Sequence, residues 1–248
     1  MANGTTVHGN PERNHLLRHL DREGVKRLQS RLVPAELHSQ EILYHPGQRI
    51  TDIYFPETAV LCMMTIMVDG RSVESATVGS EGASWVSASL GSPSMPCQTM
   101  VSVGGSARKI SAEHVELEIK RNGRFHDLLS EYSHALLISS LRIGACNALH
   151  TVTQRCARWM LTTLDRTAQE RFAITHDFLA GLLGCSRPTL TSILGELEAA
   201  GAIQTRRGMI EIVDRGRLEQ SVCECYALVH QAFEDLHGRL DDRVSSEV

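Results

Sequence analysis

The stretch that decides the fold reads HDFLAGLLGCSRPTLTSILGELEAAGAIQTRRGMIEIV, residues 176–213. Its apolar residues first recur with helical spacing over 179–183 and stop at Gly184, a residue suited to a sharp turn. A second helical stripe follows and ends at Gly201, the usual place for a glycine just beyond a helix. Two short apolar runs on either side of 206–208 then indicate a β-hairpin. Helix, tight turn, helix and hairpin in this order are typical of a winged helix-turn-helix.

In such a unit the second helix, predicted here over residues 186–200, enters the DNA major groove, and the hairpin over 203–213 forms the wing. An arginine in the first turn of the helix can donate two hydrogen bonds to guanine, and hydroxyl groups bond bases or phosphates. Paired arginines at a hairpin tip suit the phosphate backbone. The predicted DNA-contacting residues are Ser186, Arg187, Pro188, Thr189, Thr191, Ser192, Arg206 and Arg207.

Composition limits the alternatives. The chain has 248 residues, with 25 Lys and Arg against 29 Asp and Glu, a formal net charge of −4. Any DNA contact must therefore come from a local basic patch rather than from the overall charge. No apolar run is long enough to span a membrane, and residues 1–12 are polar, so we expect a disordered tail and no secretory signal. The seven cysteines are expected to stay reduced in a cytoplasm.

Residues 33–110 have a different texture. Short runs rich in β-branched and apolar residues are separated by Gly and Pro, and Asp69-Gly70 is a hairpin signal. This pattern predicts a sandwich or barrel. The expected strands are Glu41–Tyr44, Asp52–Phe55, Val60–Val68, Ser72–Val78 and Gln98–Val103.

A long helix is predicted after His114, because apolar residues are spaced 4-3-4-3-4-3. The stripe comprises Phe125, Leu129, Tyr132, Leu136, Ser139, Ile143 and Cys146. One amphipathic helix could bury such a stripe on its own β-domain, whereas a heptad period suits pairing with an identical helix. We favour a homodimer contact. Further helices are predicted over Thr151–Arg166 and Asp214–Leu240.

The string LLGCSRPTLTSILGELEAAGAI, residues 182–203, resembles the DNA-binding domain of the cyclic-AMP receptor/fumarate-nitrate regulator (Crp/Fnr) family. The resemblance implies an α+β fold and a homodimeric transcription regulator that binds a palindromic operator in double-stranded DNA, with RNA polymerase as a further partner. It also implies a β-roll sensor domain with N-terminal helices over 13–120, a dimerisation helix over 121–149 and the winged helix-turn-helix domain over 150–240.

The reading residues depart from the family pattern. Arg187 matches the usual arginine at the start of the recognition helix, so a base or phosphate contact is implied. Pro188 stands where many members have Glu, and Ser192 stands where many have a second Arg. We therefore expect this chain to read a different half-site.

The sensor domain also departs from the cyclic-nucleotide members, which share a Gly-Glu pair followed by a phosphate-binding Arg. Glu81 matches the Glu, and it is the one candidate for effector binding, but no Arg lies between Arg71 and Arg108. A buried phosphate without a cation is costly. We expect an effector other than cyclic AMP, of unknown identity.

No cofactor or metal is expected from the cysteine spacing. The iron–sulfur members carry several cysteines near the N-terminus, whereas the first here is Cys62. Cys146, His150 and Cys156 have no convergent geometry by spacing alone. Cys223 and Cys225, two apart, would point in divergent directions on a helix. Buried structural cysteine is the commoner outcome.

Two other functions are considered. A β-barrel metalloenzyme would need clustered His and Glu ligands on strands, but the β region offers His38 and His45 in no His-x-His arrangement. The sequence also contains no G-x-S-x-G and no phosphate-binding glycine loop, so we expect no enzyme. In the second alternative the β-roll signals through protein contacts and the winged helix binds a protein.

Overall fold

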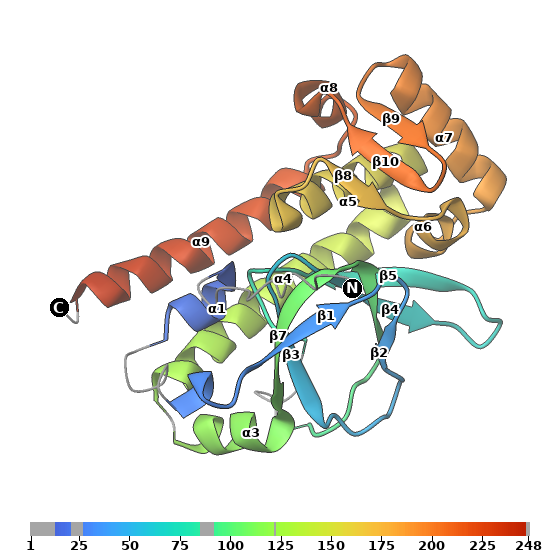
Figure 1. The fold of residues 1–248 in the computed structure, drawn as a ribbon. Coiled ribbons are helices and arrows are strands. Elements are labelled where there is room, and N and C mark those ends of the chain that lie inside the picture. The colour runs from blue at the N-terminus through green and yellow to red at the C-terminus, as the bar shows by residue number, and fades with distance from the viewer. Residues whose placement is uncertain (1–12, 21–26, 85–91, 122, 247–248) are drawn as a thin grey trace, which may run out of the picture.

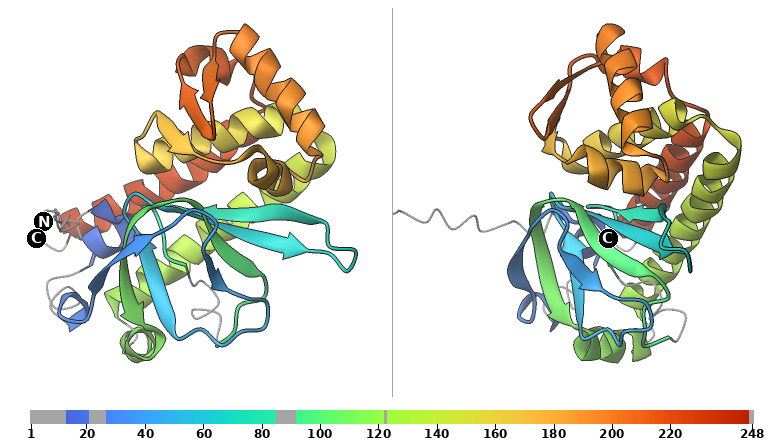
Figure 2. Two further views of the ribbon diagram at one scale, coloured as in Figure 1. Left: turned by 45° about the vertical axis from the view of Figure 1, so that its right-hand side comes forward. Right: turned by 90° about the vertical axis from the view of Figure 1, so that its right-hand side faces the viewer.

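The computed structural model describes residues 13–20, 27–84, 92–121 and 123–246, with side chains up to residue 240. The predicted tail over 1–12 lies outside these residues. Figure 1 shows a β-roll on one side, a small three-stranded sheet with its helices on the other, and long helices between and beside them. Both views of Figure 2 show the C-terminal helical part seated on one end of the roll.

The roll consists of two antiparallel sheets. One has the order β1-β7-β3, formed by Val33–Leu37, Gly105–Ser111 and Asp52–Pro56. The other has the order β2-β6-β4-β5, formed by Ile42–Tyr44, Gln98–Val103, Val60–Ile66 and Ser72–Val78. Alternate apolar side chains face the space between the sheets, as expected for half-buried strands. The five predicted strands are confirmed, and Gly70 turns the β4–β5 hairpin with a φ of 83°.

The helical stripe of residues 125–146 forms α4, Arg124–Leu149, which follows the short helices α1, His15–Arg18, and α3, Ala112–Lys120. It ends because His150 is extended, with φ −108° and ψ 153°. Thr151 and Gln154 then form a capping box that starts α5, Val152–Thr167. The break redirects the chain from the roll into the C-terminal part.

The predicted winged helix-turn-helix is present. Helix α6, His176–Leu183, and helix α7, Arg187–Ala199, are joined at Gly184, which has a φ of 62°. Strands β9, Ile203–Arg206, and β10, Met209–Ile212, form the wing, and β8, Arg171–Ala173, completes a sheet of order β8-β10-β9.

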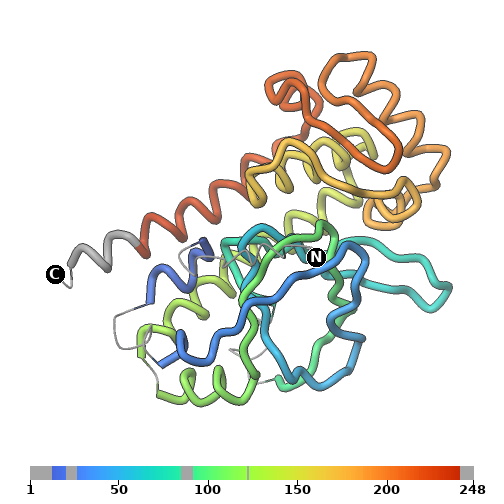
Figure 3. The backbone as a smooth tube through the Cα atoms, viewed as in Figure 1, coloured from blue at the N-terminus to red at the C-terminus, as the bar shows by residue number. Residues whose placement is uncertain are grey.

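The C-terminal segment corrects the sequence prediction of one helix over 214–240. Asp214 caps a short α8, Arg215–Glu219, and a separate α9 covers Cys225–Ser246. The non-helical residues between them turn the chain back, so that α9 packs along α4. Figure 3 shows the chain leaving the roll along α4 and returning beside it along α9.

The packing of α4 corrects the predicted dimer contact. All seven residues of the predicted stripe are buried within this one chain, by the roll, by α9 and by neighbouring side chains. They are Phe125, Leu129, Tyr132, Leu136, Ser139, Ile143 and Cys146. The first interpretation of the stripe, burial on the chain's own β-domain, is therefore the right one. The opposite face of α4 is open, with Leu137 56% and Leu141 67% exposed.

Within the part of the chain that the structure describes, no helix combines the length and apolar character needed to cross a membrane.

Candidate nucleic-acid interface

The first turn of α7 presents polar side chains on a rigid support. Ser186 is its N-cap and accepts a hydrogen bond from the Thr189 N–H, while Pro188 sits in the first turn. The buried face of the helix consists of Leu190, Ile193, Leu194 and Leu197. The six predicted residues on the other face of this turn, residues 186–189, 191 and 192, are all exposed. The side chains available for contact are thus held by a helix whose orientation is fixed by its core.

Two of the predicted hydroxyl groups have a structural partner as well. The Ser186 and Thr189 hydroxyl oxygens lie 2.8 Å apart, and the Thr191 hydroxyl donates to the carbonyl of Arg187 at 3.0 Å. His176, at the start of α6, places its Nδ1 3.3 Å from the Thr191 oxygen. His176 was not predicted; its position in the first turn of the preceding helix was the available signal.

Arg187 is held next to the surface without being committed to it. Its Nη1 lies 3.1 Å from Asp177 Oδ2, and the two side chains are 63% and 69% exposed. Exposed ion pairs of this kind contribute only about 0.2–1 kcal/mol. A bidentate contact with guanine discriminates by about 1–3 kcal/mol. Arg187 can therefore exchange Asp177 for a base at small cost.

The wing and the recognition helix share one cleft of about 410 Å³, whose lining includes His176, Arg187, Arg206 and Arg207. The wing is tied to α7 by Glu198, which accepts hydrogen bonds from the backbone N–H and the hydroxyl of Thr205. The structure thus brings the predicted arginines of helix and wing to one concave surface. Cations gathered in this way match a phosphate backbone.

Two further arginines, not predicted from the sequence, support the helix ends. Arg155 of α5 donates to the carbonyl of Leu183 at 2.8 Å, and Arg217 of α8 donates to the carbonyl of Ala200 at 3.0 Å. Each satisfies a carbonyl that the end of a helix leaves without a partner, α6 and α7 respectively. Both helices are thereby fixed by neighbouring elements.

The winged-helix part is docked on the roll through an apolar core that both share. Val60, Cys62 and Met64 of β4 belong to the same buried cluster as Trp159 and Leu179. Within this contact Trp159 Nε1 donates to Glu74 Oε2 at 3.3 Å, and Asn147 donates to the Glu74 carbonyl at 3.1 Å. Burial raises the pKa of Glu74 above its ordinary value, against the opposing effect of Arg158. The placement of α5 is therefore sensitive to what happens at β5.

The predicted effector residue Glu81 takes part in the same contact. Its carboxylate accepts from the Gly79 N–H at 3.0 Å and lies 2.9 Å from Arg166 Nη2 of α5, with both side chains 7% exposed. The guanidinium also lies over the Phe233 ring of α9, 5.5 Å from its centroid. Glu81 is thus paired with a cation that comes from α5, far along the chain from the family's cassette position.

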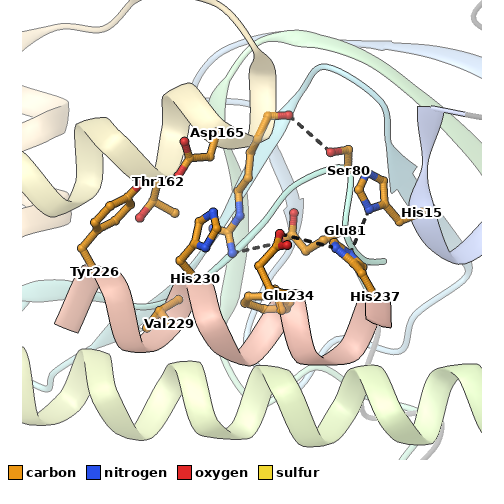
Figure 4. A pocket seen from close by; sticks show the side chains of 12 residues that line it. His15, Ser80, Glu81, Thr162, Asp165, Tyr226, Val229, His230, Glu234 and His237 are labelled. Atoms are coloured by element: carbon orange, nitrogen blue, oxygen red, sulfur yellow. Dashed lines mark hydrogen bonds and ion pairs between the residues drawn. The ribbon is translucent and has the colours of Figure 1, made fainter. Parts of the chain in front are cut away.

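A cavity of about 280 Å³ adjoins this ion pair. Figure 4 shows residues from the roll, α5 and α9 around it, including Ser80, Asp165 and His230. At one end His15 Nδ1 and His237 Nε2 lie 2.9 Å apart. Burial lowers the pKa of His237 below its ordinary value. Any change in this region acts directly on α5 and α9.

The cysteines do not lie where spacing suggested. Cys223 precedes α9 rather than lying on it, so the argument from divergent helix directions is wrong. The structure brings Cys146, His150, Cys223 and Cys225 together, whereas Cys156 is buried in the shared core near Cys185. Burial raises the pKa of the Cys225 thiol to about 12.

The fold and this surface define a class of protein: a β-roll joined by a long helix to a winged helix-turn-helix. Residues 154–221 match the family model of the Crp-like helix-turn-helix domain. No curated protein matches the chain significantly.

Solved structures of Crp/Fnr regulators share the fold. The chain is similar to a putative transcriptional regulator of this family from Eubacterium rectale, with 19% identity, a TM-score of 0.61, and 83% of this chain and 96% of that chain covered. For FixK2 from Bradyrhizobium japonicum the values are 17%, 0.57, 77% and 98%. For the c-di-GMP-responsive global regulator CLP of Xanthomonas campestris they are 16%, 0.58, 77% and 99%.

The resemblance predicted from the sequence is therefore confirmed: the C-terminal part is a Crp-like helix-turn-helix domain, and the chain has the Crp/Fnr fold. The proteins it matches are described as transcriptional regulators.

Proposed function

We propose that this chain is a transcription regulator that binds a two-fold DNA operator as a homodimer, through α7 and the wing. The observation that carries the proposal is the single cleft shared by Arg187, Arg206 and Arg207 on a domain that matches the Crp-like helix-turn-helix model. The exposed hydroxyls beside Arg187 add donors for phosphates and base edges. Such a regulator works in a bacterial cytoplasm, and contact with RNA polymerase is expected from the resemblance.

The dimer contact proposed here is the exposed face of α4 in place of the buried stripe. Its residues are spaced 4-3-4-3-4, which is again a heptad period. Two leucines supply apolar area, and small residues toward the C-terminal end allow two helices to approach closely. The proposed face comprises Ser130, His134, Leu137, Leu141, Gly144 and Ala148, all exposed in the single chain.

Signalling would run through the docked contact between the roll and α5. The Arg166–Glu81 pair and the Trp159–Glu74 hydrogen bond hold α5, and with it α6 and α7, in one place on the roll. Two recognition helices must lie about 34 Å apart to read successive major grooves. A ligand that altered the cavity beside Arg166 would change this spacing, and we expect that ligand to differ from cyclic AMP.

Selection of bound fragments from random double-stranded DNA, with the full purified chain, tests the proposal. The expected result is an enriched sequence with two inverted half-sites whose centres are one helical turn apart. Affinity for it should fall steeply with rising salt, because bound phosphates release counterions. No enrichment, or binding that does not change with salt, would overturn the proposal and favour a winged helix that binds protein.

A further inference from the structure

Four side chains with metal-binding atoms converge where the DNA-binding part of the chain begins and ends. Cys146 lies in the last turn of α4, His150 directly follows this helix, Cys223 lies between α8 and α9, and Cys225 is the first residue of α9. The three sulfur atoms and one imidazole nitrogen all lie within 4.8 Å of one another. We propose that this cluster, which we call the Cys3His cluster, is a structural zinc site.

The spacing within the Cys3His cluster fits one tetrahedral ion. The Sγ atoms of Cys146 and Cys223 are 3.5 Å apart, and the Sγ of Cys225 is 3.6 Å from Nδ1 of His150. Zinc–sulfur and zinc–nitrogen bonds of about 2.3 and 2.0–2.1 Å at tetrahedral angles place such ligand pairs about 3.8 and 3.6 Å apart. Both observed pairs therefore have nearly the separation that a shared zinc ion requires.

The second nitrogen of His150 has the partner that a metal-bound histidine usually has. Its Nε2 lies 3.3 Å from Oε2 of Glu224. With Nδ1 bound to a metal, Nε2 carries the proton and donates to the carboxylate, which fixes the ring and raises its basicity. A cluster of thiols buried only for their apolar character would need neither a histidine nitrogen beside it nor this carboxylate.

The donor set indicates which ion is bound. Three thiolates and one imidazole form a closed set of four ligands, which is typical of structural zinc. The three cysteines are 0%, 4% and 3% exposed and form a buried cluster of their own, apart from the two larger cores. Ligand atoms so close together fit one ion, because an iron–sulfur cluster spreads its ligands around several metal atoms.

The position of the Cys3His cluster gives the ion a mechanical role. The chain enters α5 directly after His150 and leaves α8 shortly before Cys223, so the ion would join the two ends of residues 151–222. It would also fasten the start of α9 to the end of α4. The consequence for DNA binding rests on the proposed function, whereas the binding of zinc does not.

Metal analysis of the full chain without a histidine tag is the first test. We expect one zinc ion per chain, and we expect chelator-treated protein to bind Co²⁺ with the intense visible absorption of a tetrahedral thiolate site. Cys146→Ser and Cys223→Ser should each lose the ion, whereas Cys97→Ser, a half-buried cysteine outside the cluster, should keep it. Absence of zinc and of the Co²⁺ spectrum in the wild-type chain would overturn the site, as would an iron–sulfur chromophore.

Glu224→Gln keeps all four ligands and guards against variants that fail to fold. It should weaken zinc affinity by about 10–100-fold, as loss of such a hydrogen bond does elsewhere. Unchanged affinity would contradict the assigned role of Glu224. Operator binding by zinc-free and zinc-loaded wild-type chain then separates the two proposals: selected DNA bound with no zinc present in any sample sinks the zinc site alone. Stoichiometric zinc in a chain that binds no DNA sinks the proposed function alone.

Discussion

The charged residues of the recognition surface and those of the contact between the roll and α5 lie in opposite environments. Arg187, Arg206 and Arg207 are exposed and weakly paired, whereas Arg166 and Glu81 are buried against each other. Exposed pairs contribute little and are easily exchanged for a ligand. A buried charge that loses its partner is strongly destabilising. The first surface is therefore suited to binding, and the second to holding the position of the DNA-binding domain.

Arg166→Met removes the cation from the buried contact and is expected to have the largest effect. It leaves the Glu81 carboxylate buried, which costs about 3–5 kcal/mol of unfolding free energy. Chemical denaturation with and without the variant measures this. The double variant Glu81→Gln/Arg166→Met should be less destabilised than Arg166→Met alone, because no unpaired charge remains. Equal stability of wild type and Arg166→Met would show that the pair does not hold α5.

Leu137→Arg with Leu141→Arg tests the open face of α4. Two cations there should prevent pairing of identical helices and give a monomer in sedimentation. Operator affinity should fall by about 10²–10⁴-fold, because the second half-site contact is no longer intramolecular. Leu117→Arg, on an equally open leucine of α3, is the control and should stay dimeric. A dimer that persists in the double variant places the interface elsewhere.

Arg206→Ala with Arg207→Ala tests the wing. If both arginines contact phosphates, the slope of log affinity against log salt should decrease by about 1.8 per wing. Affinity should fall to a similar extent on specific and non-specific DNA. Arg121→Ala, a surface arginine at the end of α3, should leave the slope unchanged. A wing variant with the wild-type slope would remove the wing from the interface.

His237 gives the smallest expected effect, a dependence of stability on pH. Burial lowers its pKa below 6.5 in the folded chain, so between that lowered value and about 6.5 the unfolded chain binds more protons. Unfolding free energy should therefore decrease as pH falls through this window. The groups that act on His237 besides burial are Glu234, Glu81, His19 and Arg18, and His15 lies in hydrogen-bond contact. His237→Gln should flatten the dependence, whereas the exposed His134→Gln should not.

The two regions also differ in how much the sequence predicts. Spacing, caps and glycines locate α6, α7 and the wing, because each depends on residues close in sequence. The partner of Glu81 could not be found in this way, since Arg166 reaches it across 85 positions of chain. The same holds for Cys146 and Cys223, which are 77 positions apart.

The stripe on α4 shows a further limit of sequence patterns. A heptad period identifies an apolar face but does not say which element covers it. Here α9 and the roll cover residues 125–146, and α9 could do so only because the segment after α8 is not helical. The division into domains stays a prediction, and the core shared by β4 and α5 shows how closely those parts pack in this conformation.

The most direct test of the account is the binding of wild-type and Arg187→Ala chains to the selected operator and to operators with each half-site position changed. Loss of the bidentate contact should lower affinity for the selected operator by about 1–3 kcal/mol and remove discrimination at one position of each half-site. Other positions should keep their discrimination. An Arg187→Ala chain that binds the selected operator as tightly and as selectively as wild type would contradict the assignment of α7 as the reading helix.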